Sequence, residues 1–159
     1  MNPASVGRFI ERLEGAFLED DARSANKELE AANVRRLQEQ YRAILRGDFA
    51  FVSDSMADDI DMEMIGPPNL PLVGHWRGRQ EVAEAVRNNF AQLENQDPEV
   101  LAVVAQGDIV VLFARETGLY RPTGKRYAIH WVQLFTFANG KISRFRGIYD
   151  SASMLDSVQ

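Results

Sequence analysis

The chain has 159 residues, 45% of them apolar, a formal net charge of -5 and no cysteine, so it can form one domain whose core folds without disulfides. The missing cysteines also exclude thiolate nucleophiles and cysteine-based zinc or iron–sulfur sites, and they favour a reducing, cytoplasmic location. The acidic balance, without a Lys/Arg tract, argues against a nucleic-acid partner, and no stretch approaches the roughly 20 apolar residues of a membrane span.

The first third of the sequence predicts helices. Between Ser5 and Leu18, apolar residues recur at helical spacing and form one stripe, which consists of Val6, Phe9, Ile10, Leu13 and Phe17. Ser24 is placed to cap a second helix that ends before Gly47. Its apolar side chains are Leu29, Val34, Leu37, Tyr41, Ile44 and Leu45. Phe49–Met56 then predicts a short helix whose inward side chains are Phe51, Val52 and Met56.

The middle of the sequence changes from helix to strand and back to helix. Ile60, Met62 and Met64 alternate with acidic residues, which is typical of a strand with one buried face. Prolines exclude regular structure from the segment 66–73. Gly74–Gly78 then leads into a helix whose apolar stripe is Val82, Val86, Phe90 and Leu93.

Strand-like runs make up most of the remaining sequence. They are Val100–Ala105, Ile109–Leu119, Tyr127–Phe137 and Ile142–Tyr149. Turn signals separate them, and helices followed by hairpin-linked strands indicate an α+β domain with an antiparallel meander. Both faces of Tyr127–Phe137 are largely apolar, so we expect helices to cover one face and a second subunit to cover the other, which makes a homodimer.

Four short segments in a fixed order suggest a family. They are Ala43–Asp48 (AILRGD), Ala57–Asp59 (ADD), Gly66–Gly78 (GPPNLPLVGHWRG) and Asn139–Asp150 (NGKISRFRGIYD). Together they resemble the SnoaL-like, ketosteroid isomerase-related group of the nuclear transport factor two-like superfamily. The resemblance implies a cone, in which a strongly curved antiparallel sheet wraps around N-terminal helices and leaves a pocket at the open end. It divides the chain into an N-terminal helical extension, residues 1–32, and a SnoaL-like domain, residues 33–159.

The implied cone turns one face of each strand toward the pocket. Alternation along the strands assigns to this face Met62, Met64, Glu116, Trp131, Gln133, Phe135, Phe145, Gly147 and Tyr149. With Tyr41 added from the second helix, the candidate ligand-binding residues are Tyr41, Met62, Met64, Glu116, Trp131, Gln133, Phe145 and Tyr149. Such a wall suits a small apolar molecule, ring-containing or terpenoid-like, oriented by Gln133, Tyr41 or Tyr149. The alternative is that these side chains are ordinary core.

The catalytic residues of two resembled enzyme types are missing. Ketosteroid isomerases use a tyrosine, a carboxylate base and a protonated acid, and these positions fall on Gln40, Met64 and Gln133. Methionine cannot accept a proton, so we exclude this chemistry. SnoaL-type cyclases place an acid where this chain has Gln133, and an amide does not exchange protons near neutral pH.

Glu116 is the only residue that fits a third template. The epoxide hydrolases of the superfamily use an Asp, Arg, Asp set, and its other two positions hold Ala114 and Gly147. In an apolar setting beside Trp131, Glu116 would be a plausible general base. The alternative is a carboxylate at the pocket mouth that is solvated or paired with a neighbouring arginine.

The remaining polar residues predict neither a metal site nor a cofactor. His130 has the opposite parity to Trp131, and His75 lies in an irregular link, so we expect structural or surface positions for both histidines. The acidic residues between Asp58 and Glu63 lack the glycine and glutamate spacing of a calcium loop.

Three functions stay open from the sequence. The first is a small-molecule pocket protein without the ketosteroid isomerase catalytic set. The second is a non-catalytic homodimeric interaction module whose cone is filled by its own side chains. The third is an enzyme of the isomerase, cyclase or hydrolase type that uses Glu116. The helix expected at Ser5–Leu18 would serve as a lid, a dimer contact or a docking element.

Overall fold

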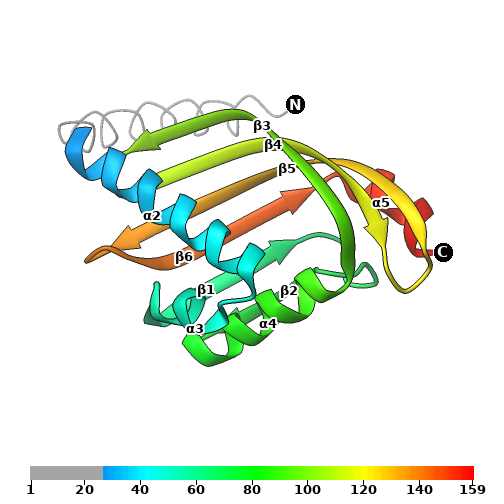
Figure 1. Ribbon diagram of the computed structural model, residues 1–159, viewed down its shortest axis with the longest axis horizontal. Helices are drawn as coiled ribbons and strands as arrows, with labels where there is room; N and C mark the ends of the chain where they lie inside the picture. Colours follow the sequence, from blue (N-terminus) through cyan, green and yellow to red (C-terminus); the bar gives the residue numbers. More distant parts are fainter. Residues whose placement is uncertain (1–26) are drawn as a thin grey trace, which may run out of the picture.

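The computed structural model of the protein describes residues 27–159 (Figure 1). Over this range the helices are α2 (Lys27–Arg46), α3 (Phe49–Asp54), α4 (Arg79–Ala91) and α5 (Ser151–Val158). The strands are β1 (Met56–Ile65), β2 (Gly74–Arg77), β3 (Leu93–Gln106), β4 (Ile109–Tyr120), β5 (Lys125–Ala138) and β6 (Lys141–Tyr149). The helix predicted at Ser5–Leu18 and the cap predicted at Ser24 lie outside the described residues.

The strands form one curved sheet in the order β2-β1-β6-β5-β4-β3. Strands β3 to β6 are the expected antiparallel meander, and the α+β class with a curved sheet around helices is confirmed. One pair departs from the expectation, because β1 runs parallel to β6 and makes the sheet mixed. These two strands are joined through α4 and four other strands instead of a hairpin, so their connection does not require opposite directions.

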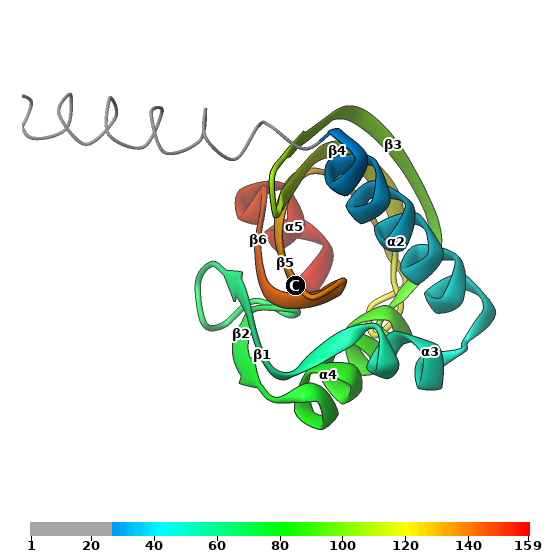
Figure 2. The same cartoon turned by 90° about the vertical axis from the view of Figure 1, so that its left-hand side faces the viewer.

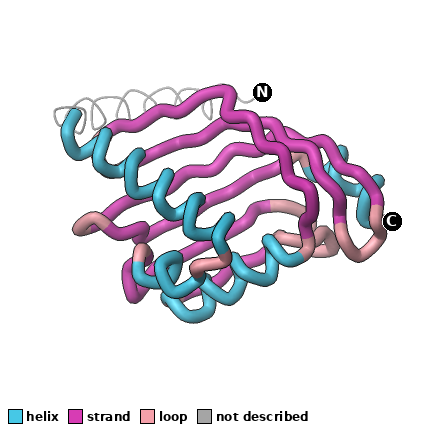
Figure 3. Tube along the Cα trace, viewed as in Figure 1, coloured by secondary structure: helices cyan, strands magenta, loops and turns pink. Residues whose placement is uncertain are grey.

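Bulges contribute to the curvature that lets the sheet enclose a space. The pairing of β3 with β4 shifts register between Glu94 and Asp97 and again between Val100 and Ala102. An extra residue in one strand bends it and increases its twist. Helices α2, α3 and α4 lie along the concave side of the bent sheet (Figures 2 and 3), and α5 packs against β5 near the other end.

Local chain chemistry sets several of the element ends. Gly47 has a φ of 70°, which ends α2, and the Asp48 carboxylate accepts a hydrogen bond of 3.1 Å from the Phe51 backbone N–H at the start of α3. Asn139 and Gly140 both have positive φ, as a tight hairpin turn between β5 and β6 requires. The sequence predicts these three positions correctly: the end of α2, the start of α3 and the turn between β5 and β6.

Apolar side chains of the predicted helices that face solvent are Leu29, Leu45 and Phe51. Leu45 is 84% exposed, because the buried side of α2 runs through Leu37, Gln40 and Ala43 and leaves Leu45 beyond it. Phe51 is also exposed, and Val52 alone is buried in α3. The inward position predicted for Phe51 was wrong, because apolar residues of a short helix do not all reach the core.

Three elements of the described chain differ from the sequence-based expectations. β2 was not predicted, and it gains its strand structure by pairing with β1. β3 begins at Leu93, which had been assigned to the preceding helix, and it contains Pro98, which an edge strand tolerates. The C-terminal helix α5 was also missed, although Asp150 caps it by accepting a bond of 3.2 Å from the Ser153 N–H.

The main core lies between the helices and the concave face of the sheet. Its most deeply buried side chains include Val52, Ile60, Val82 and Val110, so α3, β1, α4 and β4 all contribute. The helices that cover this core are amphipathic. Within residues 27–159, none is long and apolar enough to cross a membrane.

Candidate ligand-binding site

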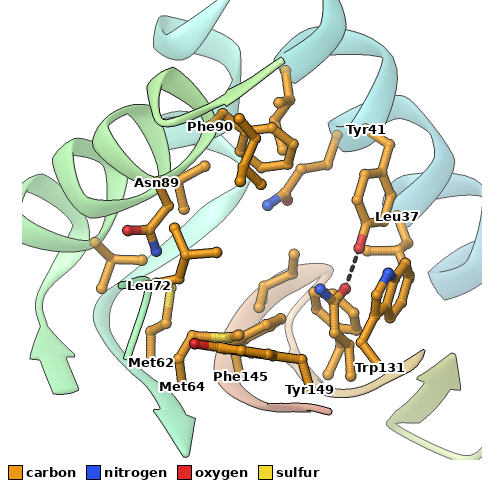
Figure 4. Close-up of a pocket in the computed structure, with 18 of the residues that line it drawn as sticks. Leu37, Tyr41, Met62, Met64, Leu72, Asn89, Phe90, Trp131, Phe145 and Tyr149 are labelled. Atoms are coloured by element: carbon orange, nitrogen blue, oxygen red, sulfur yellow. Dashed lines mark hydrogen bonds between the residues drawn. The ribbon is translucent and has the colours of Figure 1, made fainter. Parts of the chain in front are cut away.

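A cavity of about 140 Å³ lies between α2, α4 and the concave face of the sheet (Figure 4). All eight candidate residues are on its wall: Tyr41, Met62, Met64, Glu116, Trp131, Gln133, Phe145 and Tyr149. They come from α2, β1, β4, β5 and β6, and the strand register explains their convergence, since Met62 lies opposite Phe145 and Trp131 lies opposite Tyr149. The assignment of strand faces from alternation therefore agrees with the structure for the seven residues that lie on strands.

Gly147 shares this face, but a neighbouring side chain fills the room it leaves. A Cβ atom at Gly147 would collide with the sulfur of Met64 and crowd the ring of Phe145. The glycine thus lets the Met64 thioether pack against the sheet backbone, and any larger residue would displace it into the cavity.

Tyr41 and Gln133 form a polar pair on the wall. The Tyr41 hydroxyl donates a hydrogen bond to Oε1 of Gln133 (Figure 4). Burial, reinforced by the negative charge of Glu116, raises the pKa of the Tyr41 phenol above its usual value, so it stays protonated and remains a donor. Because Gln133 accepts through its oxygen, its amide N–H groups are left for other partners.

Glu116 is buried among neutral hydrogen-bond donors. Glu116 is only 8% exposed. Oε1 accepts bonds of 2.6 Å from the Tyr127 hydroxyl and 3.0 Å from Nε2 of Gln96, and Oε2 accepts one of 3.0 Å from Nε1 of Trp131. The alternative of a carboxylate that is solvated or paired with a neighbouring arginine was wrong, since Glu116 is buried and Arg115 donates to Glu99 at 2.7 Å.

The carboxylate of Glu116 keeps one acceptor position free. Two oxygens offer about four lone-pair directions, and the three donors take two on Oε1 and one on Oε2. Burial, together with the bond to Glu116, raises the pKa of the Tyr127 phenol well above its usual range. Tyr127 therefore stays a hydrogen-bond donor, and the remaining lone pair of the Glu116 carboxylate is on Oε2.

Tyr149 ties the proline-rich link to the sheet. Its hydroxyl donates a bond of 2.6 Å to the Pro71 carbonyl, and burial, with a smaller contribution from Tyr120, raises its pKa to about 12. Leu72, which follows Pro71 in the chain, lines the cavity and has a left-handed backbone conformation with a φ of 67°. A non-glycine residue is rarely held in that region, and the Tyr149 bond fixes the neighbouring peptide.

Three polar wall residues were missed by sequence reasoning: Gln40, Asn89 and Gln96. Gln40 had been considered only as a replaced catalytic tyrosine, and Gln96 lies in the part of β3 that was mistaken for loop. Asn89 could have been found, because it is seven residues after Val82 and three after Val86 and so falls on the apolar stripe of α4.

The histidines and the acidic cluster lie outside the cavity. His75 and Asp61 are 3.0 Å apart, and Arg146 approaches Asp61 at 2.7 Å. His130 is exposed and stacks on Phe113. Within residues 27–159, no group of three or more His, Cys, Asp or Glu side chains could hold a metal ion.

Comparisons with known proteins agree with the fold. The sequence profile of the SnoaL-like domain matches residues 37–145. A search of curated proteins by sequence finds no match. Among solved structures, an NTF2-like protein from Burkholderia xenovorans LB400 is 22% identical with a TM-score of 0.71, and the alignment covers 82% of this chain and 98% of that one.

Two further structures carry descriptions of activity. A candidate SnoaL-like polyketide cyclase from Jannaschia sp. CCS1 is 19% identical with a TM-score of 0.72, covering 84% of this chain and 95% of that one. An LEH-like epoxide hydrolase from M. tuberculosis is 19% identical with a TM-score of 0.64, covering 80% and 90%. Likeness at this level of identity establishes the shared fold and leaves the chemistry to the residues of the site.

Proposed function

We propose that this protein, which belongs to the SnoaL-like domain family, binds a small uncharged apolar molecule with a ring in its cavity. The observation that carries the proposal is an apolar cavity with the polar Tyr41–Gln133 pair on its wall. Pockets for small organic molecules combine these features, an apolar lining with a few placed polar groups. The family includes proteins described as polyketide cyclases and epoxide hydrolases, so its members are associated with small organic substrates.

The size of the cavity supports a compact ligand. Its volume of about 140 Å³ is close to that of an engineered apolar cavity of about 150 Å³ that binds benzene in another protein. One ring with short substituents fits this space, whereas a fused four-ring skeleton does not. The open volume also favours ligand binding over the alternative of an interaction module with a filled cone.

The charge of the wall supports an uncharged ligand. Glu116 is the single ionisable acid among the lining residues, and no Lys, Arg or His is among them. An anionic ligand would meet the buried negative charge without a counter-ion, which is costly at low dielectric. Trp131, Phe145 and Tyr149 offer ring faces for stacking.

Binding is tested by filling the cavity. We expect para-cresol to bind the purified protein in ligand-detected NMR and calorimetry, and we expect Ile44→Trp to abolish this binding because Ile44 lines the cavity. Leu45→Trp is the matched control, since the neighbouring side chain is exposed. Equal binding by the wild type and Ile44→Trp would contradict the proposal, and so would the absence of binding by any uncharged single-ring compound.

Catalysis by Glu116 is a second candidate function. The supporting observation is the free lone pair on Oε2 of a carboxylate that lines the cavity. In this case Oε2 would take a proton from a bound substrate or a water molecule. Turnover by the wild type and not by Glu116→Gln, with binding retained, is the expected result. A Glu116→Gln protein that binds and turns over unchanged would remove this candidate.

A second copy of the chain is the partner we propose for the outer face of the sheet. Exposed apolar side chains form a row across four strands there, because Ile65 lies opposite Ile148, Ile148 opposite Val132, and Val132 opposite Phe113. Ile148 is 53% exposed at the centre of this row. We expect Ile148→Lys to convert a dimer into a monomer in sedimentation experiments, while Leu45→Lys does not. A monomeric wild type would contradict this proposal.

A further inference from the structure

Asn89 is an unusual residue for its position. The inner side of α4 carries Val82, Val86 and Phe90, which line the cavity, and Asn89 lies on the same stripe. Asn89 is half-buried, so its amide does not require a partner within the protein and stays open to the cavity. Figure 4 shows the Asn89 side chain pointing into the cavity.

Among the described residues, the Asn89 amide has no hydrogen-bond partner, which sets it apart from the other carboxamides of the wall. Gln40 accepts a bond of 2.7 Å from the Ser55 hydroxyl, Gln96 donates to Glu116 at 3.0 Å, and Gln133 accepts from Tyr41. Three of the four lining carboxamides are thus fixed by the protein itself.

A structural role at the end of α4 does not account for Asn89. The helix ends at Ala91 and is capped by Gln92, whose backbone N–H bonds to the backbone carbonyls of Asn89 and Phe90. These contacts use the main chain alone and would form with any residue at position 89. The side-chain amide, with two N–H donors and one oxygen acceptor, takes no part in the helix end.

The free amide lies across the cavity from the Tyr41–Gln133 pair. Asn89 comes from α4 and Tyr41 from α2, and the two side chains approach the space from opposite sides in Figure 4. Apolar groups make up most of the remaining wall, among them Leu37, Met62 and Phe145. A ligand that satisfies both polar points must carry a polar atom on each side of an apolar body.

We propose that Asn89 is a second polar anchor of the cavity and that the ligand is an uncharged single-ring compound with two oxygen functions on opposite sides of the ring. One oxygen bonds the Asn89 amide, and the other bonds the Tyr41–Gln133 pair. This inference rests on the function proposed above, because it requires a ligand in the cavity. It adds the chemical class of that ligand and a residue that determines specificity.

A series of probes of equal shape tests the second anchor. Para-xylene, para-cresol and hydroquinone have the same number of heavy atoms and carry zero, one and two oxygens. Their dissociation constants would be measured by calorimetry under anaerobic conditions for the wild type, Asn89→Leu and Asn89→Ala. The measured quantity is the ratio of the hydroquinone and para-cresol constants, because the solvation of the free probes cancels when this ratio is compared between proteins.

We expect Asn89→Leu and Asn89→Ala to shift the preference from hydroquinone toward para-cresol by about 3- to 10-fold, the size of one neutral hydrogen bond. Asn88→Leu is the matched control, with the same change one residue earlier on an exposed side of α4, and it leaves the ratio unchanged. The alanine variant keeps the test valid if leucine obstructs the space.

The possible failures are distinguishable. If the probes bind and both Asn89 variants keep the wild-type ratio, the second anchor is refuted while the proposed binding function stands. If no probe binds the wild type, the proposed function falls, and the inference falls with it. An equal shift in Asn88→Leu would also refute the anchor, because the effect would then not come from the cavity side of α4.

Discussion

Two carboxylates of the sheet, Glu116 and Asp61, show how burial decides the kind of partner an acid needs. Glu116 faces the cavity and is held by a phenol, an indole and an amide, all of them uncharged. Asp61 lies on the outside and is held by Arg146 at 2.7 Å and His75 at 3.0 Å, with Arg77 at 3.5 Å. The buried carboxylate is stabilised by oriented dipoles, and the half-buried one by charges that water partly screens. The first arrangement should therefore be far more sensitive to mutation.

Removing the buried carboxylate is expected to have the largest effect. Glu116→Leu leaves three inward donors without an acceptor, those of Tyr127, Trp131 and Gln96. We expect the free energy of unfolding to fall by about 3 kcal/mol, measured by urea denaturation. A loss below about 1 kcal/mol would mean that water or new partners satisfy these donors, and the contrast with Asp61 would then disappear.

Removing a single donor should cost less. Tyr127→Phe deletes the hydroxyl that bonds Oε1 of Glu116 and keeps the packing of the ring, which is 3% exposed. A hydrogen bond to a charged group contributes about 1.5–3 kcal/mol, so we expect a loss of about 2 kcal/mol in the same assay. In Glu116→Leu the hydroxyl has no acceptor, so adding Tyr127→Phe to that variant should cause no further loss. Additive effects would show that the two groups do not interact.

The half-buried carboxylate of Asp61 should have the smallest effect on stability, and this effect should depend on pH. Burial alone would raise the pKa of Asp61, but hydrogen bonds from His75 and Arg146 and their charges hold it below its usual value. The unfolded chain therefore binds the proton at higher pH than the folded one, so this contribution is present above about pH 4 and is lost as the pH falls further.

Asp61→Asn isolates this contribution. We expect a loss of less than about 1 kcal/mol in the free energy of unfolding at neutral pH, reduced further by salt. The difference between wild type and variant should shrink as the pH falls from about 5 to 3. A loss as large as that of Glu116→Leu, or one that grows in acid, would show that exposure does not explain the contrast.

Much of the wall could be predicted because strands alternate with a fixed period. Once one residue of β5 was assigned to the pocket side, Trp131, Gln133 and Phe135 followed by alternation. Phe145 and Tyr149 lie opposite Phe135 and Trp131 only because the pairing of β5 with β6 shifts register between Thr136 and Phe137, which the turn at Asn139-Gly140 does not predict. The curved fold itself followed from the order of elements and from four segments that resemble a family. These features depend on neighbours in the sequence.

What escaped prediction depends on contacts between distant residues. The strand character of Gly74–Arg77 arises from pairing with β1, and the early start of β3 from pairing with β4. The partners of Glu116 come from β3 and β5, so only the assembled sheet shows that its charge is satisfied. Asn89 was not predicted because the stripe of α4 was defined by its apolar residues alone, and Asn89 is a polar residue on the same side of the helix.

Trp131 gives the cavity an optical reporter of its own. The chain has two tryptophans, and the indole of Trp131 lines the cavity with its N–H bound to the Glu116 carboxylate. A molecule that enters this space changes the surroundings of the fluorophore, and its emission changes with them. In a Trp76→Phe protein, the remaining signal would follow occupancy of the cavity in real time and without a label.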